Sequence, residues 1–367
     1  MNKHFVLTTI SLSLLLAVFL ATGPAVQAQE ATPAKSKAAR SKAPNASTAS
    51  QPAKPKEPGD EYPRPPKPAK HYTIGVLVPH LSNPHFVGQA YGYIDEGEKL
   101  GAKVILHEAG GYQYIEKQVA QMEDLIASKV DAIDLVTVSP TALINSVERA
   151  TAAGIPVLSC NVVTNSDKIV ARIRSDDRTI GRMQADAMAK LLNGKGNVVM
   201  LNSAPGVSAF EDRASSFRQR LGEIAPGIKI LGQQYSQSTP AEGLRLMEDF
   251  MQTYPQIDGV YNGTDTVAIG AAQVISSAGK QGKIKITTTD FQPDTEKFMR
   301  EGVIQAAVIQ QTVLIGRYCM RATINHLEKR SVPKEVNTPL LLVTKDTINT
   351  VDFRGVRAPD GWKPPVR

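Results

Sequence analysis

The chain contains little cysteine and little tryptophan: its 367 residues include two of the former and one of the latter. Cys160 and Cys319 are too few for the dense disulfide framework of a small secreted domain, and no C-x-x-C or other metal-ligand spacing occurs. If the chain is exported to an oxidising compartment, these two cysteines could form one disulfide. The sequence leaves open whether they approach each other. We therefore expect no metal site and no fold that depends on many crosslinks.

Motifs of catalysis are also absent. The sequence has no G-x-S-x-G, H-E-x-x-H, P-loop or G-x-G-x-x-G segment. His80 and His85 have no carboxylate at a spacing that indicates zinc, so we expect polar roles in a loop for them. These absences argue against the enzyme classes that the motifs mark. They predict a protein with no catalytic residues, no metal and no cofactor.

Long apolar runs are confined to the N-terminus. Lys3 precedes an apolar stretch at residues 5–20, and Gly23-Pro24 and a small-residue triplet ending at Ala28 follow it. A charged start, a short apolar centre and a small-residue end are typical of a cleavable secretory signal. The alternative is a membrane anchor, but the run is short of the ~20 residues that a spanning helix needs. We interpret residues 1–28 as a signal peptide that directs the chain to the periplasm.

Residues 29–70 consist mainly of Ala, Pro, Lys and Ser and contain almost no large apolar side chains. Such a segment cannot bury a core, so we expect a disordered or extended tether that does not contribute to folding. Within it, residues 31–70 carry nine Lys and Arg against three Asp and Glu, which accounts for most of the net charge of +7 of the whole chain. A basic tail can contact peptidoglycan, anionic lipid or nucleic acid. A solvated spacer is the simpler expectation, and with Tyr62 as its one aromatic residue no nucleic-acid partner is expected.

Residues 71–367 alternate apolar runs of strand type with helical stretches. This alternation predicts an α/β fold with parallel sheets and right-handed crossovers. The length exceeds the size at which one core usually divides, and the alternation restarts near Ser175, so we expect two doubly wound lobes. The expected strands span residues 73–78, 104–107, 132–136, 156–159, 169–173, 197–201, 228–233, 259–261, 284–287, 304–309 and 340–343.

Short motifs along this region resemble those of the ribose-type periplasmic binding proteins. Each motif is weak alone, but their order and spacing over roughly residues 71–345 are specific. The segments that carry the resemblance are Asn83-Pro84-His85-Phe86, Gly154-Ile155-Pro156-Val157, Ser175-Asp176-Asp177 with Gly181, Arg213 with Phe217, Asn262 to Gly270, and Asp290 with Pro293-Asp294. The resemblance implies a non-enzymatic protein whose two lobes close over a small polar solute.

The same resemblance implies how the chain is divided. The first lobe is expected to comprise residues 71–174 and 311–339, and the second 175–310 and 340–355, with a C-terminal tail at 356–367. Three crossing segments, near Arg174, Gln310 and Leu340, are expected to form the hinge. Hinge motion would bring together the two surfaces that hold the solute.

The resemblance also implies the ligand residues. A sugar-type site needs charged groups that bond adjacent hydroxyls and an aromatic face that stacks on the ring. Arg213 offers donors, Asp290 offers acceptors, and Gln310, Asn83 and Phe86 are expected to complete the site. Taken alone, the residues allow other roles: Asp290 as a helix N-cap, Arg213 as a solvated helix charge, and Phe86 as core.

Some positions depart from the family. Its first-lobe Asp-Arg pair falls here on Cys160-Asn161, its second-lobe aromatic on Ser238, and its asparagine on Thr264. Charge and stacking are both reduced, which argues against ribose itself. His85 and Tyr112 add aromatic or protonatable groups at the rim of the first lobe. We include all six residues in the expected ligand site.

A second resemblance concerns Pro79-His80-Leu81 and the segment Glu108 to Tyr112. These residues are similar to the periplasmic trimethylamine-N-oxide sensor proteins, which bind a solute and then regulate a membrane histidine kinase. This resemblance fades in the second lobe. The sequence therefore predicts a periplasmic solute-binding protein that delivers a sugar-like solute to an ABC importer. The alternative is a sensor that presents its solute, such as a methylated amine oxide, to a histidine kinase.

Overall fold

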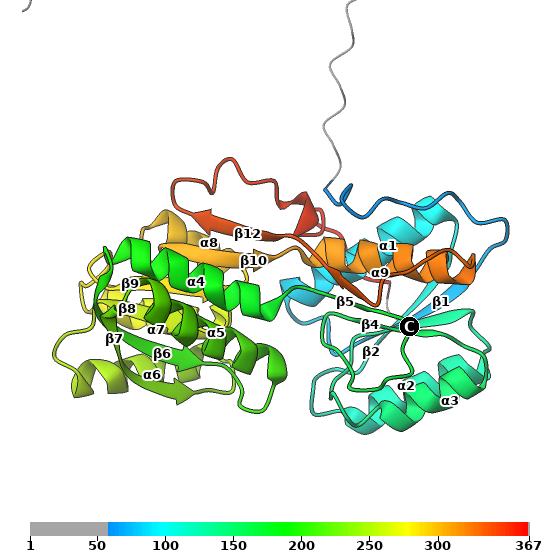
Figure 1. Ribbon diagram of the computed structural model, residues 1–367, viewed down its shortest axis with the longest axis horizontal. Helices are drawn as coiled ribbons and strands as arrows, with labels where there is room; N and C mark the ends of the chain where they lie inside the picture. Colours follow the sequence, from blue (N-terminus) through cyan, green and yellow to red (C-terminus); the bar gives the residue numbers. More distant parts are fainter. Residues whose placement is uncertain (1–57, 366–367) are drawn as a thin grey trace, which may run out of the picture. The chain divides into compact units, whose positions relative to one another are not determined.

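The computed structural model describes residues 58–365, and Figure 1 shows their strands gathered in two sheets. The predicted signal peptide, residues 1–28, and the tether up to residue 57 lie outside the described residues. Among residues 58–365, none of the helices combines the length and hydropathy that a membrane span requires.

The first sheet contains six parallel strands in the order β11-β5-β4-β3-β1-β2. These strands are β1 (Thr73–Val78), β2 (Lys103–Glu108), β3 (Ala132–Leu135), β4 (Val157–Cys160), β5 (Arg172–Arg174) and β11 (Glu335–Asn337). Its helices are α1 (Pro84–Leu100), α2 (Ile115–Ala127), α3 (Ile144–Ala152) and α9 (Thr312–Leu327). Along β1, Val76 packs in the core with α1 and α9, and Leu77 packs in the core with α2 and α3. Burial of both faces explains why the strands are continuously apolar.

The second sheet also has six strands, in the order β12-β10-β9-β8-β6-β7, and only the edge strand β12 is antiparallel. Its strands are β6 (Lys195–Asn202), β7 (Gly227–Tyr235), β8 (Gly259–Asn262), β9 (Lys285–Thr289), β10 (Ala306–Gln310) and β12 (Leu340–Thr344). Its helices are α4 (Asp177–Leu191), α5 (Ser208–Ile224), α6 (Pro240–Thr253), α7 (Asp265–Ser277) and α8 (Pro293–Arg300). Val199 and Leu201 pack with α6 and α7, whereas Val198 and Met200 pack with α4 and α5.

The chain crosses between the lobes three times, from β5 to α4, from β10 to α9 and from β11 to β12. The crossing segments bond to one another. Ser175 Oγ lies 3.0 Å from Thr338 Oγ1, and Gln311 Nε2 donates to the Pro339 carbonyl at 3.1 Å. The prediction of two doubly wound parallel-sheet lobes joined by a three-segment hinge is confirmed. After β12, a short 3₁₀ helix, Phe353–Gly355, leads to a tail whose Trp362 ring lies 5.4 Å from that of Tyr91 on α1.

The two cysteines, whose pairing the sequence left open, form a disulfide. Cys160 ends β4 and Cys319 lies on α9, 159 residues further along the chain, with their Cα atoms 6.3 Å apart. Both are completely buried in the first-lobe core. The bridge therefore fastens a helix from late in the chain to a strand from its first half.

The last part of the predicted tether packs on the first lobe, which corrects the expectation that it would stay free. We call residues 59–65 the N-terminal strap. The side chain of Arg321, on α9, donates to the carbonyls of Gly59, at 2.6 Å, and Tyr62. Arg64 Nε binds Glu96 Oε1 on α1 at 2.6 Å. Composition missed this contact because polar and aromatic anchoring, rather than a run of apolar residues, holds the strap in place.

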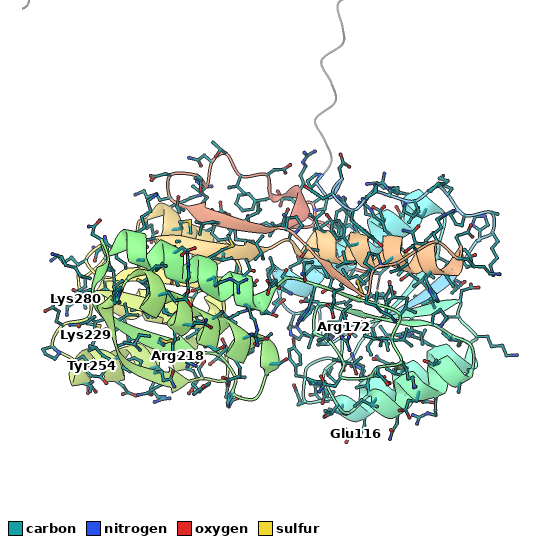
Figure 2. The ribbon with its side chains drawn as sticks, in the orientation of Figure 1. Glu116, Arg172, Arg218, Lys229, Tyr254 and Lys280 are labelled. Atoms are coloured by element: carbon teal, nitrogen blue, oxygen red, sulfur yellow. A yellow bond between two sulfur atoms is a disulfide. The ribbon has the colours of Figure 1, made fainter. Side chains whose placement is uncertain are left out.

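The outer faces carry the charged residues. Figure 2 shows the side chains of Glu116 on α2 and Lys229 on β7 reaching away from the helices and sheets, and both residues are exposed. Several exposed charges form simple local pairs, such as Arg245 with Asp249 at 2.9 Å within α6. Pairs of this kind contribute little to stability in water. The charges that lie buried between the lobes are therefore the ones that need an explanation.

Candidate functional site

The predicted ligand residues gather at the carboxyl ends of the parallel strands, the edge at which α/β sheets bind ligands. The two lobes approach each other here: His85 Nδ1 of the first lobe lies 3.6 Å from Asp290 Oδ1 of the second. We call the residues around this contact the interlobe site. Its predicted members follow β1 (Asn83, His85, Phe86), β2 (Tyr112), β4 (Asn161), β7 (Ser238), β8 (Thr264) and β9 (Asp290), or end β10 (Gln310).

Arg213, on α5, is buried and paired. It is 4% exposed, its Nε donates to Asp177 Oδ1 at 2.7 Å, and its Nη1 donates to the Gly263 carbonyl at 3.3 Å. The alternative of a solvated helix charge is therefore wrong. Burial raises the pKa of Asp177, and the neighbouring Arg213 charge opposes that rise. Sequence reasoning did not name Asp177 as a site residue, although its place at the first position of α4 was a usable signal.

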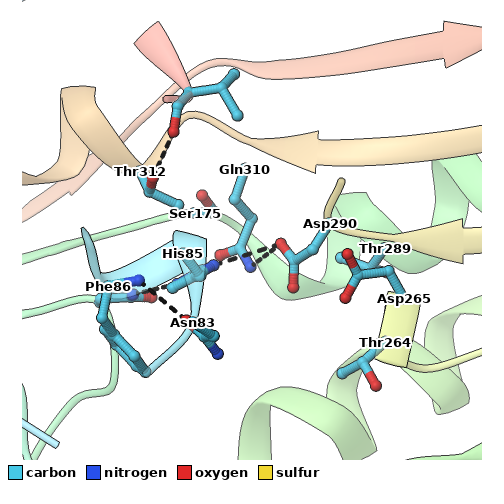
Figure 3. A network of polar contacts seen from close by, with 12 residues as sticks. Asn83, His85, Phe86, Ser175, Thr264, Asp265, Thr289, Asp290, Gln310 and Thr312 are labelled. Carbon is cyan, nitrogen blue, oxygen red and sulfur yellow. Dashed lines mark hydrogen bonds and ion pairs between the residues drawn. The ribbon is translucent and has the colours of Figure 1, made fainter. Parts of the chain in front are cut away.

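Asp290 follows β9 in the left-handed backbone region, with φ of 70°. It is not a helix cap, because α8 begins later and Gln292 is its N-cap residue. Gln310 Nε2 donates to Asp290 Oδ1 at 2.9 Å, and Figure 3 shows Gln310 and His85 converging on this carboxylate. Burial alone would raise the pKa of Asp290, but its contact with His85, the Arg213 charge and the hydrogen bond from Gln310 hold it below its usual range.

A chain of amides fixes the His85 ring. Asn161 Nδ2 lies 2.8 Å from His85 Nε2 and 3.0 Å from Gln89 Oε1. Gln89 Nε2 in turn donates to the buried Tyr93 hydroxyl at 3.3 Å. Because an amide nitrogen only donates, His85 Nε2 accepts, and the ring then carries its proton on Nδ1, the atom that faces Asp290. Asn161 thus orients a histidine here.

Aromatic rings form the rest of the first-lobe side. Phe86 is 4% exposed, so it belongs to the first-lobe core rather than offering an open stacking face. Its ring lies 4.9 Å from the rings of His80 and His85 and 6.4 Å from that of Tyr112. Tyr112 is 44% exposed overall. Nevertheless, burial raises the pKa of its hydroxyl, and the charges of Arg213 and Asp290 both act on it, which places that end of the side chain beside the second lobe.

The remaining predicted residues have mainly local roles. The sulfur of Cys160 is bonded to that of Cys319 in the disulfide, so the prediction of Cys160 as a ligand residue is wrong. Asn83 is the N-cap of α1, and its Oδ1 accepts from the Phe86 N–H at 3.2 Å. Ser238 Oγ accepts from the Ala204 N–H at 3.3 Å, and Thr264 Oγ1 accepts from Ser203 Oγ at 3.2 Å. Ser238 and Thr264 thus shape the second-lobe loops at the strand ends.

Two further polar residues lie at this edge without having been predicted. Asp265, at the start of α7, accepts from the Gln292 N–H at 2.7 Å and from Gln292 Nε2 at 2.9 Å. Burial and then the Asp290 charge raise its pKa. Asn202, the last residue of β6, is 2% exposed, and neither side-chain amide atom has a hydrogen-bond partner among the described residues. The position of Asn202 at the end of an apolar strand was the only sequence signal for it.

Comparison with known proteins agrees with this architecture. A family model described as a periplasmic binding protein domain matches residues 74–331. The ribose import binding protein of Bacillus subtilis is 32% identical over 276 residues, which cover 75% of this chain and 88% of that protein.

Two solved structures are similar as well. An ABC transporter solute binding protein from Bradyrhizobium sp. BTAi1, with bound Bis-Tris, has a TM-score of 0.77 and 27% identity, covering 83% of this chain and 92% of that one. A solute binding protein from Burkholderia graminis C4D1M, in complex with D-arabinose, has a TM-score of 0.72 and 25% identity, covering 78% and 99%.

Fold and relatives together define a two-lobed solute-binding protein. The chain belongs to the periplasmic binding protein family, and within it to the type I proteins of the ribose kind. The family that the sequence motifs indicated is thus confirmed.

Proposed function

We propose that this protein captures a sugar or sugar-like polyol between its two lobes in the periplasm and delivers it to an ABC importer of the inner membrane. The observation that carries the proposal is the convergence of Arg213, Asp290 and Gln310 on one side and His85 and Tyr112 on the other. A polyol presents both donors and acceptors, and this set of side chains offers both as well. No protein group in it is arranged as a nucleophile with a general base.

The relatives support the importer role. The B. subtilis protein is a ribose import binding protein, and the Bradyrhizobium and Burkholderia proteins are solute binding proteins of ABC transporters. None of the three is a sensor, so the histidine-kinase alternative has only Tyr112 and its neighbouring motif in its favour. The periplasmic location follows from the family and from the predicted export signal.

A ligand screen tests this function. The mature chain is heated with pentoses, hexoses, inositols, linear polyols and methylated amine oxides, and hits are titrated by calorimetry. We expect at least one sugar or polyol to raise the melting temperature and to bind with micromolar or better affinity, because ligand bound only to the folded state stabilises it by mass action. Binding of an amine oxide alone, with no response to any sugar or polyol, would favour the sensor instead.

A further inference from the structure

The second-lobe side of the interlobe site is rich in carboxylates. The Arg213 charge acts on Asp177, and the Asp290 charge acts on Asp265. Arg213 donates its Nε–H to Asp177 at 2.7 Å. On the first-lobe side, the polar side chain beside His85 is the neutral amide of Asn161. The pairing of Arg213 with Asp177 therefore leaves Asp290 without a dedicated arginine partner on either side.

Asp290 has unused capacity to accept hydrogen bonds. Its Oδ1 accepts from Gln310 Nε2 at 2.9 Å, and the contact with His85 Nδ1, at 3.6 Å, is longer than a hydrogen bond. Among the described residues, no hydrogen bond reaches Oδ2. The Asn161 amide contacts the other ring nitrogen of His85, so His85 faces Asp290 with Nδ1 alone. A positive group between the lobes would complete the coordination of this carboxylate.

The first-lobe side is suited to the same positive group. The rings of His80, Phe86 and Tyr112 form an edge-to-face cluster with centroids 4.9 to 6.4 Å apart. Aromatic rings opposite a carboxylate are the usual surroundings of a bound ammonium group, because the ring faces are negative and tolerate its low hydration. Arginine or lysine side chains on this side would repel such a group, and the polar members named here, His85 and Asn161, are of neither type.

The hydroxyl-bearing part of a solute also has a partner. Asn202 ends β6, one residue before Ser203, and its amide oxygen and nitrogen are buried without partners among the described residues. Buried polar groups are nearly always bonded to protein, water or ligand. An amide that must both donate and accept matches a hydroxyl group, which does the same.

We propose that the solute is an aminated polyol or amino sugar, whose ammonium group lies between Asp290 and the exposed Tyr112 ring and whose hydroxyl groups reach Asn202. The proposal rests on the proposed function, because it narrows the class of polyol that the interlobe site takes. It assigns discrimination between amine and alcohol to Asp290.

Matched pairs of compounds test this. D-Glucosamine is compared with D-glucose, and N-methylglucamine with sorbitol, by thermal shift and calorimetry in a buffer free of amines. We expect the aminated member of at least one pair to bind ten times or more tightly than its neutral partner. Its affinity should fall several-fold between 20 mM and 500 mM salt, because salt screens the attraction between the free cationic solute and the carboxylate-bearing open site. Salt should not affect a neutral sugar in this way.

Two variants test whether Asp290 is the residue that makes the site prefer an aminated compound to its neutral partner. Asp290→Asn keeps the shape and an acceptor but removes the charge, so the ratio of the two affinities should fall to near one. Asp294→Asn removes the same charge from an exposed position on α8 and should leave the ratio unchanged. If Asp290→Asn does not fold, the salt dependence of the unaltered protein still decides.

The outcomes distinguish a failure of the amine proposal from a failure of the proposed function. Equal or tighter binding of the neutral partners in both pairs would overturn the amine proposal and leave sugar capture intact. If neither aminated nor neutral compounds of the wider screen bind, the proposed function fails, and the amine proposal fails with it.

Discussion

The two lobes share one architecture but meet the solute with different chemistry. The first-lobe side of the interlobe site is neutral: aromatic rings, and a histidine held by the Asn161–Gln89 amides. The second-lobe side is charged, with Arg213 bonded to Asp177 and Asp290 bonded to Gln310. Equivalent strand ends in two similar sheets therefore do not imply equivalent recognition. A solute can favour closure only if it contacts both sides, so each side sets its own requirement.

The lobes also differ in how they are fastened. The first lobe has a disulfide from β4 to α9 and the N-terminal strap over α1 and α9. Within the described residues, the second lobe has neither and relies on its apolar core and its buried ion pair. We infer that the first lobe is the rigid partner in hinge closure and that the second lobe adjusts its charges to the solute.

The largest expected effect comes from breaking the buried pair of the second lobe. Arg213→Ala leaves Asp177 buried without its cation, which should cost about 3–5 kcal/mol of unfolding free energy and abolish binding. Denaturant unfolding of the variant measures this cost. Arg245→Ala is the matched control: it breaks an exposed pair with Asp249, so stability should change by less than about 1 kcal/mol. Equal stability of Arg213→Ala and the unaltered chain would show that the pair contributes nothing.

A somewhat smaller effect is expected from the covalent tie of the first lobe. Replacing both Cys160 and Cys319 with alanine should lower the unfolding free energy by about 2–5 kcal/mol, because the bridge closes a long loop in the unfolded chain. Calorimetry with and without reductant measures the loss, and reductant should have no further effect on the double variant. A change in solute affinity of more than a few-fold would argue against a purely structural role.

Removing the N-terminal strap should have an intermediate effect. A chain that begins at Lys70 loses the two carbonyls bonded to Arg321 and the Tyr62 ring, which lies 5.2 Å from that of Tyr318. We expect a loss of about 1–3 kcal/mol, since the buried guanidinium then loses two carbonyl acceptors and keeps its bonds to Glu96. A chain that begins at residue 58 keeps the strap and should melt like the full mature protein. Identical melting of both shortened chains would mean that the strap does not stabilise the lobe.

The smallest effect concerns a buried carboxylate that has no cation. Burial raises the pKa of Asp134, on β3, to about 7, and a hydrogen bond from Thr323 only partly opposes this. Because the folded state holds a proton that the unfolded state releases near pH 4, stability should fall as pH rises from 4 to 7 and then level off. The loss between pH 6 and 8 should be about 1 kcal/mol. Asp134→Asn should flatten this part of the profile, whereas an unchanged slope would assign it to other groups.

The sequence predicted the lobes well because burial of both sheet faces leaves a strong signal. Its apolar runs located most strands to within a few residues. It missed β11, Glu335–Asn337, in which only Val336 is buried. An edge strand of three residues with one inward side chain has no periodicity to detect.

The sequence indicated which strand ends carry the candidate site residues, but not which of these residues bond to one another. Asp290 and Gln310 were expected as ligand residues, and the structure brings them together. The sequence gives no sign that Arg213 binds Asp177, or that the thiol of Cys160 is consumed by a bridge, because both depend on segments far apart in the chain. The strap was missed for the same reason: its partner, Arg321, is an ordinary helix residue until the fold buries it.

Small-angle scattering with a ligand from the screen tests the central claim most directly. A saturating solute should reduce the radius of gyration of the unaltered protein, because the solute contacts the aromatic side of the first lobe and the charged side of the second at the same time. At the same solute concentration, Asp290→Asn should stay as expanded as the unliganded protein. Full compaction of that variant, or none in the unaltered protein at saturation, would contradict capture by two unlike sides.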